Sequence, residues 1–262
     1  MIPARQDRRF LVALAVMGGW YLLLIAAMLV ADVLSTPWNR MLQILQDPAI
    51  RYALRLSLAT ATTSTLIALT VAIPLGYLLA RERFMGRPIL QAIVEIPLVL
   101  PPTVVGLSLL VLFESPWGRI VQTIIPVTYA VPGIIVAQVT VITAFAVHSL
   151  QTTFRQLDPR TEHVARTLGC TRWQAVTRIV LPEAKSGILA ASLLAWTRAL
   201  GEFGPILVLC GVTRFRTEVL ATSVYLEWST GQLDAALAVA LLLAIVATSV
   251  LLTLRFTRPH QT

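Results

Sequence analysis

Long apolar stretches alternate with short polar segments along the chain. A helix needs about 20 mostly apolar residues to cross a bilayer, and six stretches meet that length: residues 10–31, 56–80, 88–113, 132–154, 186–211 and 235–254. Four of them are uncharged, the third contains Glu95, and the fifth contains Arg198 and Glu202. The pattern predicts six transmembrane helices.

The apolar stretches are continuous, whereas strands of a membrane barrel alternate apolar and polar residues. Lipid offers no partners to backbone polar groups, so continuous spans must be helices. Only 13% of the 262 residues are charged, against about 25% in a soluble domain. We therefore expect an all-α, polytopic membrane bundle that forms a single domain over residues 1–262, with no tandem repeat.

The first apolar stretch follows Arg5, Arg8 and Arg9, as the apolar part of a signal peptide would. That part is normally about 7–15 residues long, and the stretch here is longer. This favours a retained first helix, with a signal peptide as the alternative.

Basic residues are distributed unevenly between the two sides that six spans create. The side holding both termini carries fourteen Arg and Lys residues, in segments 1–9, 81–87, 155–185 and 255–262, and the opposite side carries six. Because cytoplasmic loops are enriched in Arg and Lys, both termini are expected in the cytoplasm. The basic residues form no continuous tract, so the positive charge does not indicate nucleic-acid binding.

The cytoplasmic segment 158–182 carries the signals of two short helices. Asp158 and Pro159 suit a helix start, and Gly169 suits the left-handed residue that ends such a helix. Thr171 to Gln174 has the spacing of a capping box, and Pro182 is expected to end the second helix. The segment is either a loop packed on its own membrane domain or a docking element for another protein.

Three prolines lie within the third apolar stretch. Pro97, Pro101 and Pro102 each lack a backbone donor, which interrupts a helix. Irregular backbone within a membrane is tolerated only against protein or a water-lined cavity. Together with Glu95, these prolines are candidates for a hinge or for the lining of a pathway; a static kink is the alternative.

The fifth stretch combines charge with helix-breaking residues. Arg198 and Glu202 are four residues apart, on one helix face, and charges at this depth normally face the bundle interior. Gly201, Gly204 and Pro205 surround them. We interpret these five residues as candidates for a pathway or gate, with a structural ion pair as the alternative.

The chain contains none of the patterns of an enzyme. There is no phosphate-binding loop, no nucleophile–base combination and no metal-ligand spacing around its two cysteines. Energy for transport must come from another molecule, and the docking element suits a separate ATPase. An ion-coupled secondary transporter would often show inverted repeats, which are not apparent, and a membrane scaffold would not explain the broken helices.

Gly169, then nine residues, then Ile179-Val180-Leu181-Pro182, resembles the cytoplasmic EAA signature of ABC importer permeases with the type I fold. The resemblance implies a coupling helix seated in a cleft of the ATPase. The family's Glu-Ala-Ala falls on residues 163–165, so Glu162 lies one position early. The coupling residues it implies are Glu162, His163, Ala165, Leu168, Gly169, Trp173, Ile179, Leu181 and Pro182.

Three further stretches, RYALRLSLATATTSTLIALTVAIPLGYLLAR, IPLVLPPTVVG and RALGEFGP, resemble the permeases of molybdate, tungstate and sulfate. The resemblance implies an inner-membrane homodimer with two cytoplasmic ATPase subunits, which hold the ATP and Mg²⁺, and an external oxyanion-binding protein. The permease itself would bind no cofactor. Molybdate or tungstate is the favoured substrate, and sulfate or thiosulfate is the alternative.

Overall fold

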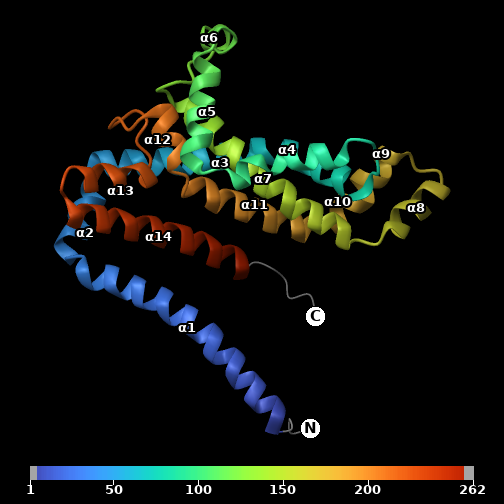
Figure 1. Ribbon diagram of the computed structural model, residues 1–262, viewed down its shortest axis with the longest axis horizontal. Coiled ribbons are helices and arrows are strands. Elements are labelled where there is room, and N and C mark those ends of the chain that lie inside the picture. Colours follow the sequence, from blue (N-terminus) through green and yellow to red (C-terminus); the bar gives the residue numbers. More distant parts are fainter. Residues whose placement is uncertain (1–4, 257–262) are drawn as a thin grey trace.

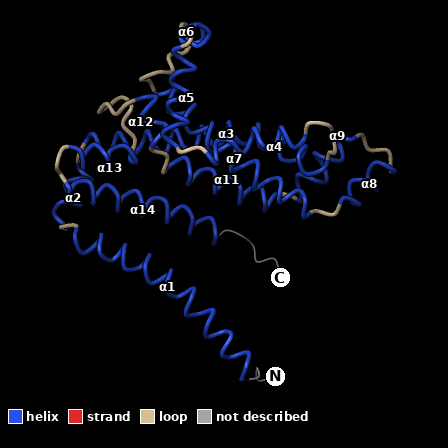
Figure 2. The backbone as a smooth tube through the Cα atoms, in the orientation of Figure 1, coloured by secondary structure: helices blue, strands red, loops and turns tan. Residues whose placement is uncertain are grey.

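A computed structural model describes the backbone of residues 5–256 and the side chains of residues 10–252. Within the described backbone, every regular element is a helix (Figures 1 and 2). Four helices are long and apolar enough to cross a membrane: α1 (Arg5–Ser35), α3 (Pro48–Arg81), α7 (Val131–Gln156) and α14 (Leu233–Phe256). Two bent helix pairs raise the possible number to six, so the all-helical, multi-span architecture is confirmed.

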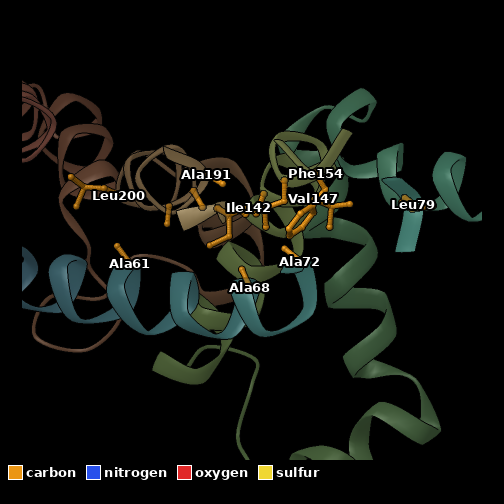
Figure 3. Close-up of a cluster of buried hydrophobic side chains, with 14 of the residues drawn as sticks. Ala61, Ala68, Ala72, Leu79, Ile142, Val147, Phe154, Ala191 and Leu200 are labelled. Atoms are coloured by element: carbon orange, nitrogen blue, oxygen red, sulfur yellow. The ribbon is translucent and has the colours of Figure 1, made fainter. Parts of the chain in front are cut away.

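Helices α3 and α7 pack together with α11 (Lys185–Leu200) to form the centre of the bundle (Figure 1). Their shared core is rich in alanine, and Figure 3 shows part of it around Ile142 and Phe154. Small residues let membrane helices approach closely, which strengthens their van der Waals contact. The alanines of this core that are 0% exposed are Ala61, Ala68 and Ala72 on α3, and Ala191, Ala195 and Ala199 on α11.

The third span is broken where the prolines predict. Helix α4 (Arg87–Val99) and helix α5 (Pro102–Glu114) meet at an angle of 111°. Leu100 and Pro101 form the break, because neither Pro101 nor Pro102 can donate the backbone hydrogen bond that would continue α4. Beyond the break, α5 leaves the bundle direction and carries the short helix α6 (Pro116–Gln122) at its far end (Figure 1).

The fifth span is not the single helix expected over residues 186–211. It ends at Leu200, and a separate helix, α12 (Gly204–Cys210), begins after a break of three residues. Pro205 has no amide hydrogen for a bond to the Gly201 carbonyl, which explains an interruption here. Helix α12 has seven residues, which at about 1.5 Å per residue is too short to cross a bilayer.

The extramembrane segments expected around 32–55 and 212–234 are also helical. They contain α2 (Trp38–Gln46) and α13 (Leu220–Ser229), and α3 begins at Pro48, eight residues before the expected start at residue 56. Asp47 caps α3 by accepting from the Ala49 amide at 2.8 Å. The first helix diverges from the bundle, and none of its most apolar window is buried (Figure 1).

Candidate functional site

The segment expected in the cytoplasm, residues 158–182, forms the two capped helices that the sequence predicts. Asp158 is the N-cap of helix α8 (Pro159–Thr167), and its carboxylate accepts from the Arg160 amide at 2.9 Å. Gly169 has φ +93°, the left-handed geometry expected after such a helix. Helix α9 (Arg172–Ala175) begins with a complete capping box between Thr171 and Gln174. We call residues 158–184 the coupling segment.

The second helix of the coupling segment does not stop at Pro182, as the sequence analysis expected. It continues from α9 through a π-helical turn, η1 (Val176–Val180), into the short helix α10 (Leu181–Glu183). The wide turn pairs the Leu181 amide with the Val176 carbonyl, and Pro182 sits in the first turn of α10, where no amide hydrogen is needed. The chain instead bends by 71° at Ala184, where α11 begins.

The outward face of the coupling segment exposes large apolar side chains among basic residues such as Arg160 and Arg166. Leu168 is 80% exposed and Trp173 is 76% exposed. Helices α8 and α9 lie at one end of the bundle (Figure 1). A large exposed apolar surface normally marks a contact with another molecule. His163, Gly169 and Pro182 are also exposed, whereas Ile179 and Leu181 are half-buried.

Two of the expected coupling residues face inward. Ala165 is buried, and Glu162 is only 8% exposed. The Glu162 carboxylate accepts a hydrogen bond of 2.6 Å from the Tyr77 hydroxyl on α3. Glu162 therefore contacts this chain's own membrane domain, and the residues that present apolar surface are Leu168 and Trp173.

The two broken spans meet where α5 crosses α12. A Cβ atom added at Gly106 would lie 2.7 Å from the Cα of Pro205, and one added at Gly204 would lie 3.0 Å from the Cβ of Pro102. Each helix thus places a glycine against a proline of the other. The structure brings together the pathway candidates Pro102, Gly204 and Pro205, which are about 100 residues apart in sequence.

Replacing Gly106 with leucine is expected to force this crossing apart, because its Cβ would overlap backbone rather than a movable side chain. Overpacking of this kind costs about 1–3 kcal/mol. The midpoint of thermal unfolding in detergent should fall and uptake should be lost. Gly201→Ala is the matched control, because its Cβ would meet only the Thr197 carbonyl at 3.7 Å; equal loss in both variants would contradict the close crossing.

Arg198 and Glu202 form the ion pair that their spacing suggests. A guanidinium nitrogen of Arg198 lies 2.8 Å from Oε2 of Glu202, and the side chains are 32% and 1% exposed. The guanidinium also lies 5.6 Å from the centre of the Phe145 ring on α7, within range of a cation–π contact. The pair joins the last turn of α11 to the break before α12, with Gly201 between its members.

Glu95 does not join the other pathway candidates. It accepts a hydrogen bond of 3.0 Å from the Gln91 side chain within α4. It lines a small cavity beside His148 and Gln151 of α7, more than one turn before the break at Leu100. Pro97 lies inside α4, and Pro101 is the N-cap of α5.

Gln138 is a structural residue that the sequence analysis missed. Its amide nitrogen donates to the Ala199 carbonyl at 2.9 Å, and its amide oxygen accepts from the Ser64 hydroxyl at 2.8 Å. The side chain is 1% exposed, so it links α3, α7 and the last turn of α11 inside the bundle. An amide side chain within an uncharged span was the available signal, since such a group must find partners in lipid.

Replacing Gln138 with leucine should loosen the end of α11. The change removes both bonds of Gln138 and leaves the Ser64 hydroxyl with the Ile135 carbonyl at 3.5 Å and the Ala199 carbonyl with the Glu202 amide at 3.2 Å. Each lost hydrogen bond costs about 0.5–1.5 kcal/mol. We expect a lower midpoint of thermal unfolding and faster amide exchange at residues 199–203. Ser64→Ala removes one of the two bonds and should have a smaller effect; an equal effect would mean that Gln138 does not hold the Ala199 carbonyl.

Comparison with known proteins places the chain among transport proteins. Residues 72–258 match the family described as the inner membrane component of binding-protein-dependent transport systems. The chain is 40% identical to a probable molybdenum ABC transporter permease of Haloferax volcanii over 75% of this chain and 71% of that protein. It is 32% identical to the sulfate transport system permease of Escherichia coli over 88% of this chain and 84% of that protein.

A solved structure has the same arrangement of helices. The chain resembles a subunit of a bacterial ABC transporter involved in the import of the acidic polysaccharide alginate, with a TM-score of 0.78. The match covers 96% of this chain and 95% of the other at 20% identity, which supports the fold alone.

Proposed function

The chain belongs to the family of inner membrane components of binding-protein-dependent transport systems. We propose that it is the membrane subunit of an ATP-driven importer and carries a tetrahedral oxyanion, molybdate or tungstate, across the membrane. The chain is a multi-pass membrane protein and not itself an enzyme. ATP is hydrolysed by a separate subunit, and the family assignment replaces the ion-coupled carrier and the scaffold as explanations.

The observation that carries the mechanism is that the outward face of the coupling segment exposes two large apolar side chains. Leu168 and Trp173 project from a rigid, doubly capped helix pair at the end of the bundle. Burial of such side chains contributes about 1.5–3 kcal/mol each, which favours seating the segment in a cleft of the ATPase. The proposed coupling residues are those on this outward face together with Gly169, whose geometry sets the angle between α8 and α9.

Transport needs a pathway that opens to one side at a time. We propose that two copies of the chain form this pathway, with both termini in the cytoplasm as the uneven distribution of basic residues indicates. ATP-driven approach of the two ATPase subunits would move the coupling segments. Helices would transmit that movement to the two breaks that meet at the crossing of α5 and α12, where Arg198 and Glu202 lie close to the break in the fifth span.

The choice of substrate rests on the relatives. The molybdenum permease is the more similar over its matched region, and the sulfate permease matches over more of the chain. Sulfate or thiosulfate is therefore the second candidate. All of these are oxyanions of similar geometry, and an external binding protein would make most of the selection.

Uptake by reconstituted vesicles tests the proposal. Vesicles that contain the permease, its ATPase and its external binding protein should accumulate molybdate only when ATP is supplied on the ATPase side. Tungstate should compete with molybdate, and sulfate should not compete at equal concentration. Uptake without ATP, or driven by a pH gradient, would contradict the importer; preferential uptake of sulfate would overturn only the substrate.

A further inference from the structure

Glu162 lies on the coupling segment, yet its carboxylate is turned toward the membrane domain. The side chain is 8% exposed, and its bonded oxygen lies 2.6 Å from the Tyr77 hydroxyl on α3. A bond from a neutral hydroxyl to a carboxylate is shorter and stronger than one between neutral groups. Glu162 is thus held by α3 and is not available as the main contact of an external protein.

The hydroxyl of Tyr77 is aimed by core packing. Its ring meets the ring of Phe154 edge-on, with centroids 5.8 Å apart and an interplanar angle of 86°. Phe154 lies on α7 and is fully buried in the core that α3, α7 and α11 share. If Glu162 moves, Tyr77 cannot move with it unless the packing of the bundle changes. A flexible surface side chain would not be restrained in this way.

Two further bonds join the same end of α3 to the coupling segment. Arg172 on α9 forms an ion pair with Glu82, the residue after α3. The Arg81 guanidinium donates to the Leu157 carbonyl at 3.1 Å, just before α8. Residues 77–82 therefore hold the first helix of the segment, the second helix and the connection that leads into them.

Helix α3 is also linked, farther from the coupling segment, to the end of α11 at the break in the fifth span. Helix α3 contacts α7 and α11 along its length, and its Ser64 hydroxyl binds Gln138, which binds the Ala199 carbonyl next to the break. A displacement of α3 at Tyr77 is thereby carried through hydrogen bonds and packed helices to the end of α11. The covalent connection at Ala184, by contrast, includes a bend of 71°.

We infer that Tyr77 and Glu162, supported by Arg172 and Glu82, are positioning residues that make α3 the span that receives the movement of the coupling segment. The inference rests on the proposed function and goes beyond it. Glu162 contributes to the conversion of ATP hydrolysis into transport without being a binding contact for the ATPase.

The ratio of ATP hydrolysed to oxyanion imported tests this inference in the complete importer in vesicles. Tyr77→Phe removes one hydroxyl and keeps the ring on Phe154, and Glu162→Gln removes the charge. Both variants should retain the ATPase on purification and hydrolyse ATP within about twofold of the unmodified protein, while import per ATP falls about fivefold or more, the range of a coupling free energy. The amide introduced by Glu162→Gln could still accept a weaker, neutral bond from Tyr77, so Glu162→Gln should have the smaller effect. The double variant should be no worse than Tyr77→Phe alone, because that change already removes the bond.

Tyr52→Phe is the matched control, since it deletes a hydroxyl from the outer end of the same helix. Arg172→Glu should also uncouple import, and Arg172→Glu combined with Glu82→Arg should restore it. Loss of the ATPase from Glu162→Gln but not from Tyr77→Phe would identify Glu162 as a docking contact and overturn the inference. Unchanged import per ATP in both would overturn it as well, and ATP-independent uptake by the unmodified complex would refute the proposed function and this inference together.

Discussion

Arg198→Gln is expected to abolish uptake and to destabilise the permease, because it leaves a buried carboxylate without its counter-ion. Glu202 is 1% exposed, and Arg198 lies 2.8 Å from it. Removing one partner of a buried ion pair lowers the free energy of unfolding by about 3–5 kcal/mol. We expect a loss at the lower end of that range, because Arg198 is 32% exposed. The midpoint of thermal unfolding in detergent and the rate of ATP-dependent uptake measure the two effects separately.

The double variant Arg198→Gln with Glu202→Gln separates a role in the pathway from a purely structural one. It removes both charges and keeps side chains of similar size, so most of the lost stability should return. Uptake should remain at background if the pair acts in the pathway at the break between α11 and α12. Recovery of uptake together with stability would show that the pair only stabilises the fold.

Gly169→Ala is expected to weaken the binding of the ATPase about tenfold or more, because it strains the turn that sets the angle between α8 and α9. Gly169 has φ +93° and nothing within 4 Å of an added Cβ, so the change introduces backbone strain and no clash. Left-handed geometry costs a residue with a Cβ about 1–2 kcal/mol, and 1.4 kcal/mol corresponds to a factor of ten in affinity. The affinity of the purified permease for its ATPase measures the effect.

Gly231→Ala is the control for this prediction. Gly231 has φ +80°, also has open space around an added Cβ, and lies between α13 and α14 at the other end of the bundle. Gly231→Ala should lower the free energy of unfolding about as much as Gly169→Ala does, and it should leave the affinity for the ATPase unchanged. The docking role of the coupling segment would be contradicted if both variants bound the ATPase as the unmodified protein does.

Local signals in the sequence sufficed for much of the fold and part of the site. The apolar stretches predicted the spans because lipid forces each one to satisfy its own backbone. Pro101 and Pro102 predicted the break in the third span, since a missing amide hydrogen acts on its own turn. Asp158, Gly169 and the Thr171–Gln174 capping box predicted the helix pair, because caps act within a few residues.

The features that the sequence left open depend on contacts between distant residues. The sequence by itself determined how many apolar stretches there are, where prolines interrupt them and which helices are capped. Only the tertiary structure decided that Gly106 packs on Pro205, that Glu162 turns toward Tyr77, and that Gln138 binds the end of α11. Those contacts join residues far apart along the chain, and their geometry is set by how closely the small residues of α3, α7 and α11 let the helices approach.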